Sequence, residues 1–247
     1  MRKMLKPVLR RLGYKSKPRP FSEFISFKET IAGAKAAGVS VGDYIERKHS
    51  TGPRSPLDQT IDGLAALGLF NSSIEKVCEL GPGSGRYLER IRALCKPRLY
   101  EIYETSSEWR NWLVEHYGVV PRSCDGRTLV ETMNGSIGLV HAHKVFPGTP
   151  FLITASYFRE MARIVRDDGW VVFDIMTESC FSREHLDAWF KADPWQWEWS
   201  PRMTGRDYTI KMFAERGIAL AGSFQVPLFP AVTECMVFRK TRSGSQK

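Results

Sequence analysis

The segment Val77 to Arg90, VCELGPGSGRYLER, most constrains how this chain can fold, because it places three glycines at alternate positions between an apolar run and a helix-like run. Glycine has no Cβ, so Gly81, Gly83 and Gly85 can adopt positive φ and turn the chain sharply. A ligand can also lie directly against such a backbone. The segment therefore predicts a strand, a ligand-binding loop and a helix in an α/β fold.

The spacing of the glycines separates the nucleotide-binding motifs to which this loop could belong. A dinucleotide-binding loop has the pattern G-x-G-x-x-G and a P-loop ends in Gly-Lys-Ser/Thr, and this chain has neither. Its pattern, Glu79-x-Gly81-x-Gly83-x-Gly85, resembles the first motif of the class I S-adenosylmethionine-dependent methyltransferases. The resemblance implies that Glu79 and the three glycines bind S-adenosylmethionine. The alternative is a tight turn of an α/β protein without this ligand.

Two further acids occur where the resemblance implies cofactor ligands. Glu104 ends the predicted second strand, LYEIYE, 23 residues after Gly81, and in Rossmann folds an acid about 20 residues beyond the glycine loop binds ribose hydroxyls. Asp125, in the sequence SCDG, follows a third apolar piece, and the resemblance implies a contact with the adenine amino group. The alternatives are an exposed carboxylate at Glu104, with Glu101 as its competitor, and a plain Asp-Gly turn at Asp125.

The predicted fourth strand, Ile137 to Val145, carries His141 and His143 on one face. Ligands of open α/β sheets bind at the carboxyl ends of the strands. A histidine, with an ordinary pKa of about 6.5, can take the proton of a hydroxyl. We therefore expect His143, nearer the strand end, to be the general base of an O-methylation, with His141 as the second candidate. Both could instead be structural. No carboxylate cluster accompanies the pair, so no metal site is expected.

The rest of the chain follows the order of elements that the resemblance implies. In chain order these are a helix at Phe151 to Arg166, a turn at Asp168-Gly169, a buried strand at Trp170 to Ile175, and strand-like runs at Ile218 to Val226 and Val232 to Arg239. The implied fold is a Rossmann-like α/β methyltransferase domain in residues 57–247, with a mostly parallel seven-stranded sheet and an antiparallel last strand. Gly138 stands where many relatives carry an acid, so the role of that acid does not transfer.

Basic residues are concentrated at the start of the chain. The net charge is +9, and residues 1–50 contain twelve Lys and Arg against four Asp and Glu. The remainder is nearly neutral, which argues against a broad nucleic-acid groove. Residues 1–20 combine apolar side chains at helical spacing with basic ones. Such a helix can lie on an anionic membrane surface, pack on the domain or on a second subunit, or stay disordered.

Residues 1–56 are interpreted as this basic segment followed by a helical lid. Helices before the glycine loop often cover the cofactor and shape the acceptor pocket in the family that the chain resembles. Tyr44, Arg47 and His49 are the candidates for that lid, with packing or solvation as the alternative for each.

A tryptophan-rich segment follows the predicted fifth strand. It contains Trp189, Trp195, Trp197 and Trp199, interleaved with Asp193, Gln196 and Glu198. Aromatic faces beside acids and amides are typical of carbohydrate recognition. The alternation of the last three tryptophans equally fits a half-buried strand that covers the core.

Together these features predict an S-adenosylmethionine-dependent O-methyltransferase that acts on a sugar hydroxyl of a glycan or glycolipid precursor. The segment after the fourth strand, HKVFPG, lacks the Asn/Asp, proline and aromatic clamp of enzymes that methylate base amines. It also lacks the cysteine nucleophile that cytosine C5 methylation needs. Two alternatives stay open: an aromatic or polyketide-like small-metabolite acceptor, and an RNA-binding modifier or scaffold that uses the basic arm.

Compartment and assembly are only loosely constrained. Five cysteines without a C-x-x-C pair indicate reduced thiols. No apolar run approaches the roughly 18 residues of a membrane span, and the start lacks the apolar core of a secretory signal. We expect a cytoplasmic protein whose residues 1–20 could contact the inner face of the membrane. An oligomer is compatible with the sequence.

Overall fold

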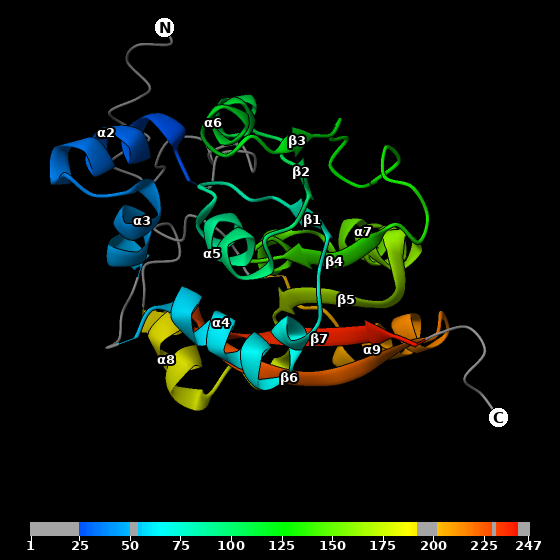
Figure 1. Ribbon diagram of the computed structural model, residues 1–247. Helices are drawn as coiled ribbons and strands as arrows, with labels where there is room; N and C mark the ends of the chain where they lie inside the picture. The colour runs from blue at the N-terminus through cyan, green and yellow to red at the C-terminus, as the bar shows by residue number, and fades with distance from the viewer. Residues whose placement is uncertain (1–24, 50–53, 192–201, 229–230, 242–247) are drawn as a thin grey trace, which may run out of the picture.

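The computed structural model describes residues 25–49, 54–191, 202–228 and 231–241. In these residues seven strands form one sheet in the order β3-β2-β1-β4-β5-β7-β6 (Figure 1). Strands β1 (Lys76–Leu80), β2 (Leu99–Tyr103), β3 (Val120–Pro121), β4 (Ile137–Ala142) and β5 (Val165–Ile175) run parallel. β7 (Ala231–Lys240) lies antiparallel between β5 and β6 (Ile218–Leu228). The predicted mostly parallel sheet with an antiparallel last strand is confirmed.

The central strands are apolar because helices cover both faces of the sheet. Every residue of β4 is buried, and so are the last seven residues of β5. Parallel strands of this kind read as continuous apolar runs, since neither face meets water. β6, at the edge of the sheet, instead alternates between exposed and half-buried residues along most of its length.

Within the part of the chain that the structure describes, three helices cover one face of the sheet and two cover the other. The first group is α4 (Pro56–Ala66), α5 (Arg86–Cys95) and α6 (Ser107–Tyr117), and the second is α7 (Phe151–Ile164) and α9 (Arg206–Ala214). Leu64, Leu88 and Leu113 anchor the first group on a core with Val77 and Leu139. The resulting three-layer sandwich places the parallel strands in a dry interior.

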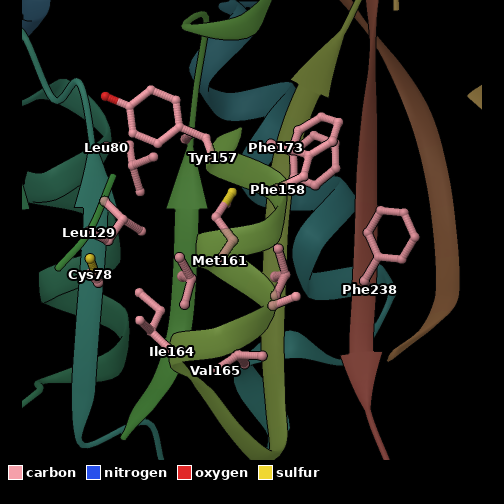
Figure 2. Close-up of a cluster of buried hydrophobic side chains, with 14 of the residues drawn as sticks. Cys78, Leu80, Leu129, Tyr157, Phe158, Met161, Ile164, Val165, Phe173 and Phe238 are labelled. Carbon is pink, nitrogen blue, oxygen red and sulfur yellow. The ribbon is translucent and has the colours of Figure 1, made fainter. Parts of the chain in front are cut away.

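Aromatic rings fill the core on the second face. Phe158 of α7 stacks on Phe173 of β5 with ring centroids 4.4 Å apart, and Phe213 of α9 stacks on Phe238 of β7 at 4.5 Å. Figure 2 shows Phe158 against Phe173, with Met161 and Ile164 of α7 facing the sheet beside them. Stacked and edge-on aromatic pairs add to the stabilisation from buried area.

The remaining elements are short and lie at the ends of the sheet. They are helices α2 (Phe27–Ala37), α3 (Val41–His49) and α8 (Arg183–Lys191), and the 3-10 turns η2 (Leu69–Asn71), η3 (Phe146–Gly148) and η4 (Glu178–Cys180). Helices α2, α3 and α4 agree with the predicted helical region before the glycine loop. Figure 1 shows α2 and α3 together at one end of the sheet, the end at which the parallel strands terminate.

Several predicted boundaries were wrong, among them the start of β5, which is Val165 instead of Trp170. β4 ends at Ala142 instead of Val145, because the chain leaves the sheet at His143 and Lys144 takes a left-handed backbone with φ of 61°. Helix α7 ends at Ile164 instead of Arg166, because Val165 is extended and already pairs with Ile137. The expected Asp168-Gly169 turn is therefore an irregularity within β5, where Asp168 has φ of 58°.

Candidate active site

The glycine loop makes the turn that its sequence predicts. Gly81, Gly83 and Gly85 have φ of 59°, 52° and 73°. Each glycine adopts a left-handed backbone conformation that costs other residues about 1–2 kcal/mol. A Cβ at Gly81 would lie 2.8 Å from Val145, and one at Gly85 would lie 2.6 Å from Leu113. A Cβ at Gly83 would meet nothing within 4 Å. The first and last glycines therefore allow close packing, whereas Gly83 faces open space that a ligand could fill.

Glu104 lies against this loop, as predicted from its distance along the chain. Its Oε2 accepts a hydrogen bond from Gly83 N at 2.9 Å, and its Oε1 accepts one from Ser106 N at 2.8 Å. Burial raises the pKa of Glu104, and the hydrogen bonds from Ser106 and Gly83 oppose the shift. A buried acid beside three glycines is thus fixed where β1 and β2 end.

Glu79 lies beneath the loop rather than on its surface. Its side chain is buried, and its Oε2 accepts a hydrogen bond from the Tyr100 hydroxyl at 2.8 Å. Burial raises the pKa of Glu79 to about 8, so the carboxyl group carries its proton at neutral pH. This carboxyl group therefore has a hydrogen-bond partner inside the fold. The expected contact of Glu79 with a cofactor stays a prediction.

The two histidines of the fourth strand differ in position. His141 is fully buried, its Nε2 lies 2.9 Å from the Tyr100 hydroxyl and 3.9 Å from Glu79 Oε2, and burial lowers its pKa well below the usual range. This histidine belongs to an interior network with Glu79 and Tyr100. This interior position does not favour His141 as the general base.

His143 lies just past the end of β4, at the carboxyl edge of the sheet. Its ring stacks on Tyr87 of α5 with centroids 4.1 Å apart and planes inclined by 19°. Burial, together with the positive charges of Lys144 and Arg86, lowers the pKa of His143 to about 3. Its Nε2 is buried and has no hydrogen-bond partner among the described residues. His143 is therefore a neutral imidazole with an unsatisfied nitrogen.

Asp125 forms a turn of its own. Its carboxylate accepts hydrogen bonds from Arg127 N at 2.9 Å and from Thr128 N at 2.7 Å, and its side chain is 45% exposed. Thr128 Oγ1 donates to the second oxygen at 2.8 Å. The contact with an adenine amino group stays a prediction, and the turn by itself accounts for the Asp-Gly sequence.

Helices α2 and α3 pack on the helices that begin beside the glycine loop. Arg86, the first residue of α5, forms an ion pair with Glu46 of α3, and both side chains are about nine-tenths buried. Trp109 Nε1 of α6 donates to Ile25 O at 2.8 Å, and Phe27 of α2 packs edge-on against the same tryptophan. The described N-terminal helices therefore pack beside the starts of α5 and α6, and their role as a lid stays a prediction.

The individual residues expected in the lid are less informative. The ring of Tyr44 fills the space beside Gly33 and joins α3 to α2, and Arg47 is exposed. The side chains of His49 and Trp189 lie outside the described residues, as do residues 1–24 and Trp195, Trp197 and Trp199. The expected membrane helix and sugar-stacking surface accordingly stay predictions.

The structure adds residues that sequence reasoning missed. Lys144 and Asp174 form an ion pair of 3.0 Å at the ends of β4 and β5, with 12% and 2% of their side chains exposed. Tyr87 stacks on His143, and the hydroxyl of Tyr100 lies within hydrogen-bond distance of His141. Tyr100 could have been found from its place in a buried strand, whereas the pairing of Lys144 with a residue 30 positions later has no local signal. Among the described residues no cluster of histidine, cysteine or acidic side chains could hold a metal ion.

Comparison with known proteins gives a match in structure but not in sequence. No family model matches the chain, and no curated protein matches it. An O-methyltransferase family protein from Burkholderia thailandensis matches over 96% of this chain and 68% of that one, with TM-score 0.59 and 12% identity. The N-methyltransferase NodS from Bradyrhizobium japonicum, in complex with S-adenosyl-L-homocysteine, matches over 77% and 90%, with TM-score 0.56 and 13% identity.

A third solved structure matches along almost the whole of both chains. This structure is magnesium protoporphyrin IX methyltransferase from Synechocystis PCC 6803, with bound S-adenosyl-L-homocysteine. The match covers 98% of this chain and 100% of that chain, with TM-score 0.54 and 12% identity. This chain has the class I S-adenosylmethionine-dependent methyltransferase fold. Within the methyltransferase fold, the glycine loop, Glu104 and His143 all lie at the carboxyl edge of the sheet, where such α/β folds bind ligands.

Proposed function

We propose that this chain is an S-adenosylmethionine-dependent O-methyltransferase and that its acceptor is a sugar hydroxyl. The observation that carries the choice of oxygen is His143. A neutral imidazole stands beside the cofactor loop, and its buried Nε2 lacks a partner among the described residues. A hydroxyl group, unlike a methyl acceptor without an ionisable proton, would satisfy that nitrogen and give it a proton.

The residues present fit the cofactor. The space beside Gly83 would receive a nucleoside, and Glu104 would accept hydrogen bonds from its ribose hydroxyls. S-adenosylmethionine, when bound, supplies an electrophilic methyl group on a sulfonium. The other cofactor residues of the proposal are Glu79, Gly81, Gly85 and Asp125.

The low pKa of His143 limits what this residue can do. An imidazole of pKa about 3 does not deprotonate a free alcohol to any extent. A hydroxyl would become far more acidic as its oxygen forms a third bond, to the methyl group that leaves the sulfonium, and a neutral imidazole held against it could then take the proton. We therefore assign His143 to orient the hydroxyl and to accept its proton late in the reaction. Access to Nε2 requires a change of conformation, because this atom is buried.

The sugar assignment rests on the sequence of the tryptophan-rich segment. Trp195, Trp197 and Trp199 supply flat faces, and Asp193, Gln196 and Glu198 supply hydrogen-bonding groups. A glycan or glycolipid precursor would carry such a sugar. Residues 1–20 would bring the enzyme to the membrane at which lipid-linked precursors are found. Among the described residues, no helix has the length and apolar character to cross a bilayer.

The test is to incubate the protein with methyl-labelled S-adenosylmethionine and a fractionated extract of the source cells. We expect label in the carbohydrate fraction, as a methyl ether that survives mild base and appears as an O-methyl sugar after acid hydrolysis. Label in aromatic metabolites, or in RNA or protein, would replace the sugar assignment. Base-labile label would indicate a carboxyl acceptor, and the absence of label in every fraction would contradict methyl transfer.

His143→Ala provides the residue-level test of the same proposal. We expect methyl transfer to fall about 10²- to 10⁴-fold, the range for loss of a general base, while the affinity for S-adenosyl-L-homocysteine stays within about twofold. Full activity of this variant would remove His143 from the mechanism. His141→Ala is a poor comparison, because it would open a cavity in the interior network with Tyr100.

A further inference from the structure

Two buried ion pairs adjoin the stacked rings of Tyr87 and His143, because Arg86 precedes the tyrosine and Lys144 follows the histidine in the chain. In one pair the backbone N–H of Lys144 donates to Asp174 Oδ1 at 2.5 Å, and its Nζ lies 3.0 Å from Oδ2. The backbone of Lys144 is left-handed, and both of its groups contact the same carboxylate. In the other pair Glu46 of α3 contacts Arg86 of α5. Charged side chains are rarely buried without a functional or structural reason.

The four charges act on the two rings. Lys144 and Arg86 both lower the pKa of His143, and the charges of Asp174 and Glu46 both act to raise that of Tyr87, whose pKa is raised chiefly by burial. Lys144 Nζ also donates to Thr233 Oγ1 of β7 at 2.7 Å. One polar cluster therefore joins α3, α5 and the carboxyl ends of β4 and β5 at the edge of the sheet where the glycine loop lies.

This cluster holds several buried polar atoms that lack hydrogen-bond partners in the described chain. They are Glu46 Oε2, Tyr87 Oη, His143 Nε2 and Asp174 Oδ2. The last is within reach of Lys144 Nζ but at an angle unsuited to a hydrogen bond. Buried polar groups are normally satisfied, and each exception calls for an explanation. A ligand with several hydroxyl groups would explain the imidazole nitrogen and the two carboxylate oxygens together, whereas the hydroxyl of Tyr87 interacts with the side chain of Thr60.

Resting on the proposed function, we infer that this cluster is the recognition site of a polyhydroxylated acceptor. One hydroxyl lies against His143 and receives the methyl group. Neighbouring hydroxyls donate to Asp174 Oδ2 and Glu46 Oε2, which accept no hydrogen bond from the described residues, because ionised carboxylates accept strong hydrogen bonds. The acceptor therefore presents at least three hydroxyl groups, one for His143 and one for each carboxylate, as a sugar ring does.

The site also predicts how the acceptor is admitted. Glu46 lies on α3 and Asp174 on the sheet, so a ligand that bridges them would tie the lid to the strand ends. The Glu46–Arg86 pair already holds α3 against the first turn of α5. Acceptor binding would add a second connection, from α3 to the strand ends, which would hold the lid closed during the reaction.

The experiment uses Asp174→Asn and Glu46→Gln, which keep the shape of each side chain and remove its charge. The probe is the carbohydrate fraction that the wild-type protein labels, with methyl-labelled S-adenosylmethionine as donor. We expect KM for this fraction to rise at least tenfold in each variant, while the Kd of S-adenosyl-L-homocysteine changes less than about twofold. Glu75→Gln is the matched control, because Glu75 forms an ion pair with Arg98 that is 66% exposed at both side chains. It should match the wild type in both measurements.

The Asp174→Asn variant leaves Lys144 buried without a counter-charge, which is strongly destabilising. A second variant therefore covers the case in which Asp174→Asn does not fold. The double variant Lys144→Met/Asp174→Leu removes both charges together, and such replacements are often tolerated. It should raise KM to the same degree. Unchanged KM in the folded variants, with or without a lowered melting temperature, would mean that the pairs are structural and would overturn the inference. A parallel loss of S-adenosyl-L-homocysteine affinity would overturn it too. Failure of the proposed function is distinct, because the wild type would then label no fraction.

Discussion

Glu104 accepts a hydrogen bond from the backbone N–H of Gly83 over 2.9 Å, although the two residues are 21 positions apart. The contact exists because β1 and β2 are parallel neighbours, so the loop after one strand meets the residue after the other. The same carboxylate accepts from Ser106 N at the start of α6. Glu104 thus fixes the loop and remains able to accept hydrogen bonds from a ribose.

Glu104→Ala should weaken S-adenosyl-L-homocysteine binding about 10- to 100-fold in calorimetry, because a hydrogen bond to a charged group contributes about 1.5–3 kcal/mol. Glu104→Gln should lose less, since its amide oxygen can still accept from Gly83. Glu75→Ala removes an exposed acid near the opposite end of β1 and should bind like the wild type. Wild-type affinity in Glu104→Ala would remove Glu104 from the cofactor site.

Gly83→Ala should reduce S-adenosyl-L-homocysteine affinity at least tenfold, because its methyl group would enter the open space in which we place the cofactor. Gly118→Ala is a close control: Gly118 has φ of 60°, and a Cβ there also meets nothing within 4 Å. Both substitutions force alanine into a left-handed conformation and should destabilise the fold by about 1–2 kcal/mol. Equal affinities in the two variants would show that the space beside Gly83 binds no ligand. Thermal melting and calorimetry give the two readouts.

The pH dependence of kcat/KM tests the electrostatics of His143. Because the pKa of His143 is about 3, its imidazole is neutral throughout the range from pH 5 to 8. The profile of the wild type should therefore show no inflection near pH 6.5 that comes from this group. His143→Ala should lower the rate across the range without changing the shape of the profile. An inflection near 6.5 that disappears in His143→Ala would mean that this histidine is more exposed in the working enzyme.

Much of the architecture follows from local sequence features. The three glycines predicted the turn, since only their backbone freedom permits positive φ at alternate positions. Continuous apolar runs predicted buried parallel strands, and the run after Asp168-Gly169 is one of these. The place of Glu104 was predictable as well, because adjacent parallel strands end at the same edge of a sheet.

The chemistry of the side chains was harder to predict, because it depends on contacts between distant positions. Glu79 reads as a ligand in the sequence, yet Tyr100, 21 residues later, takes its carboxyl group into the interior. Lys144 carries no signal for a left-handed backbone, a conformation that usually indicates glycine or asparagine. Its pairing with Asp174 depends on how β4 and β5 align. The helix boundary at Ile164 was missed because β5 starts before its apolar run.

Glu79 should make the protein less stable as pH rises through neutrality. Burial, and to a lesser degree the charge of Glu104, raises the pKa of Glu79 from 4.5 to about 8. The folded state therefore holds a proton between pH 4.5 and 8 that the unfolded state has released, so the stabilisation is complete below 4.5 and is lost as pH rises through 8. His141 and His143 act in the opposite direction, since their lowered pKa values cost stability below about pH 6.5. Between pH 6.5 and 8.5 the two histidines no longer change the stability with pH, so this range reports on the carboxyl group of Glu79.

Within that range, the melting temperature of the wild type should fall with pH, and that of Glu79→Gln should stay nearly level, because its amide is neutral at every pH and can still accept from Tyr100. The melting temperature of Glu75→Gln should fall with pH as that of the wild type does, since Glu75 is an exposed acid directly before β1. Glu104, whose pKa is also raised by burial, contributes in the same direction as Glu79 and accounts for any residual slope in Glu79→Gln. Parallel curves for the wild type and Glu79→Gln would show that Glu79 is ionised in the folded protein, with its charge balanced by a proton on His141, 3.9 Å away.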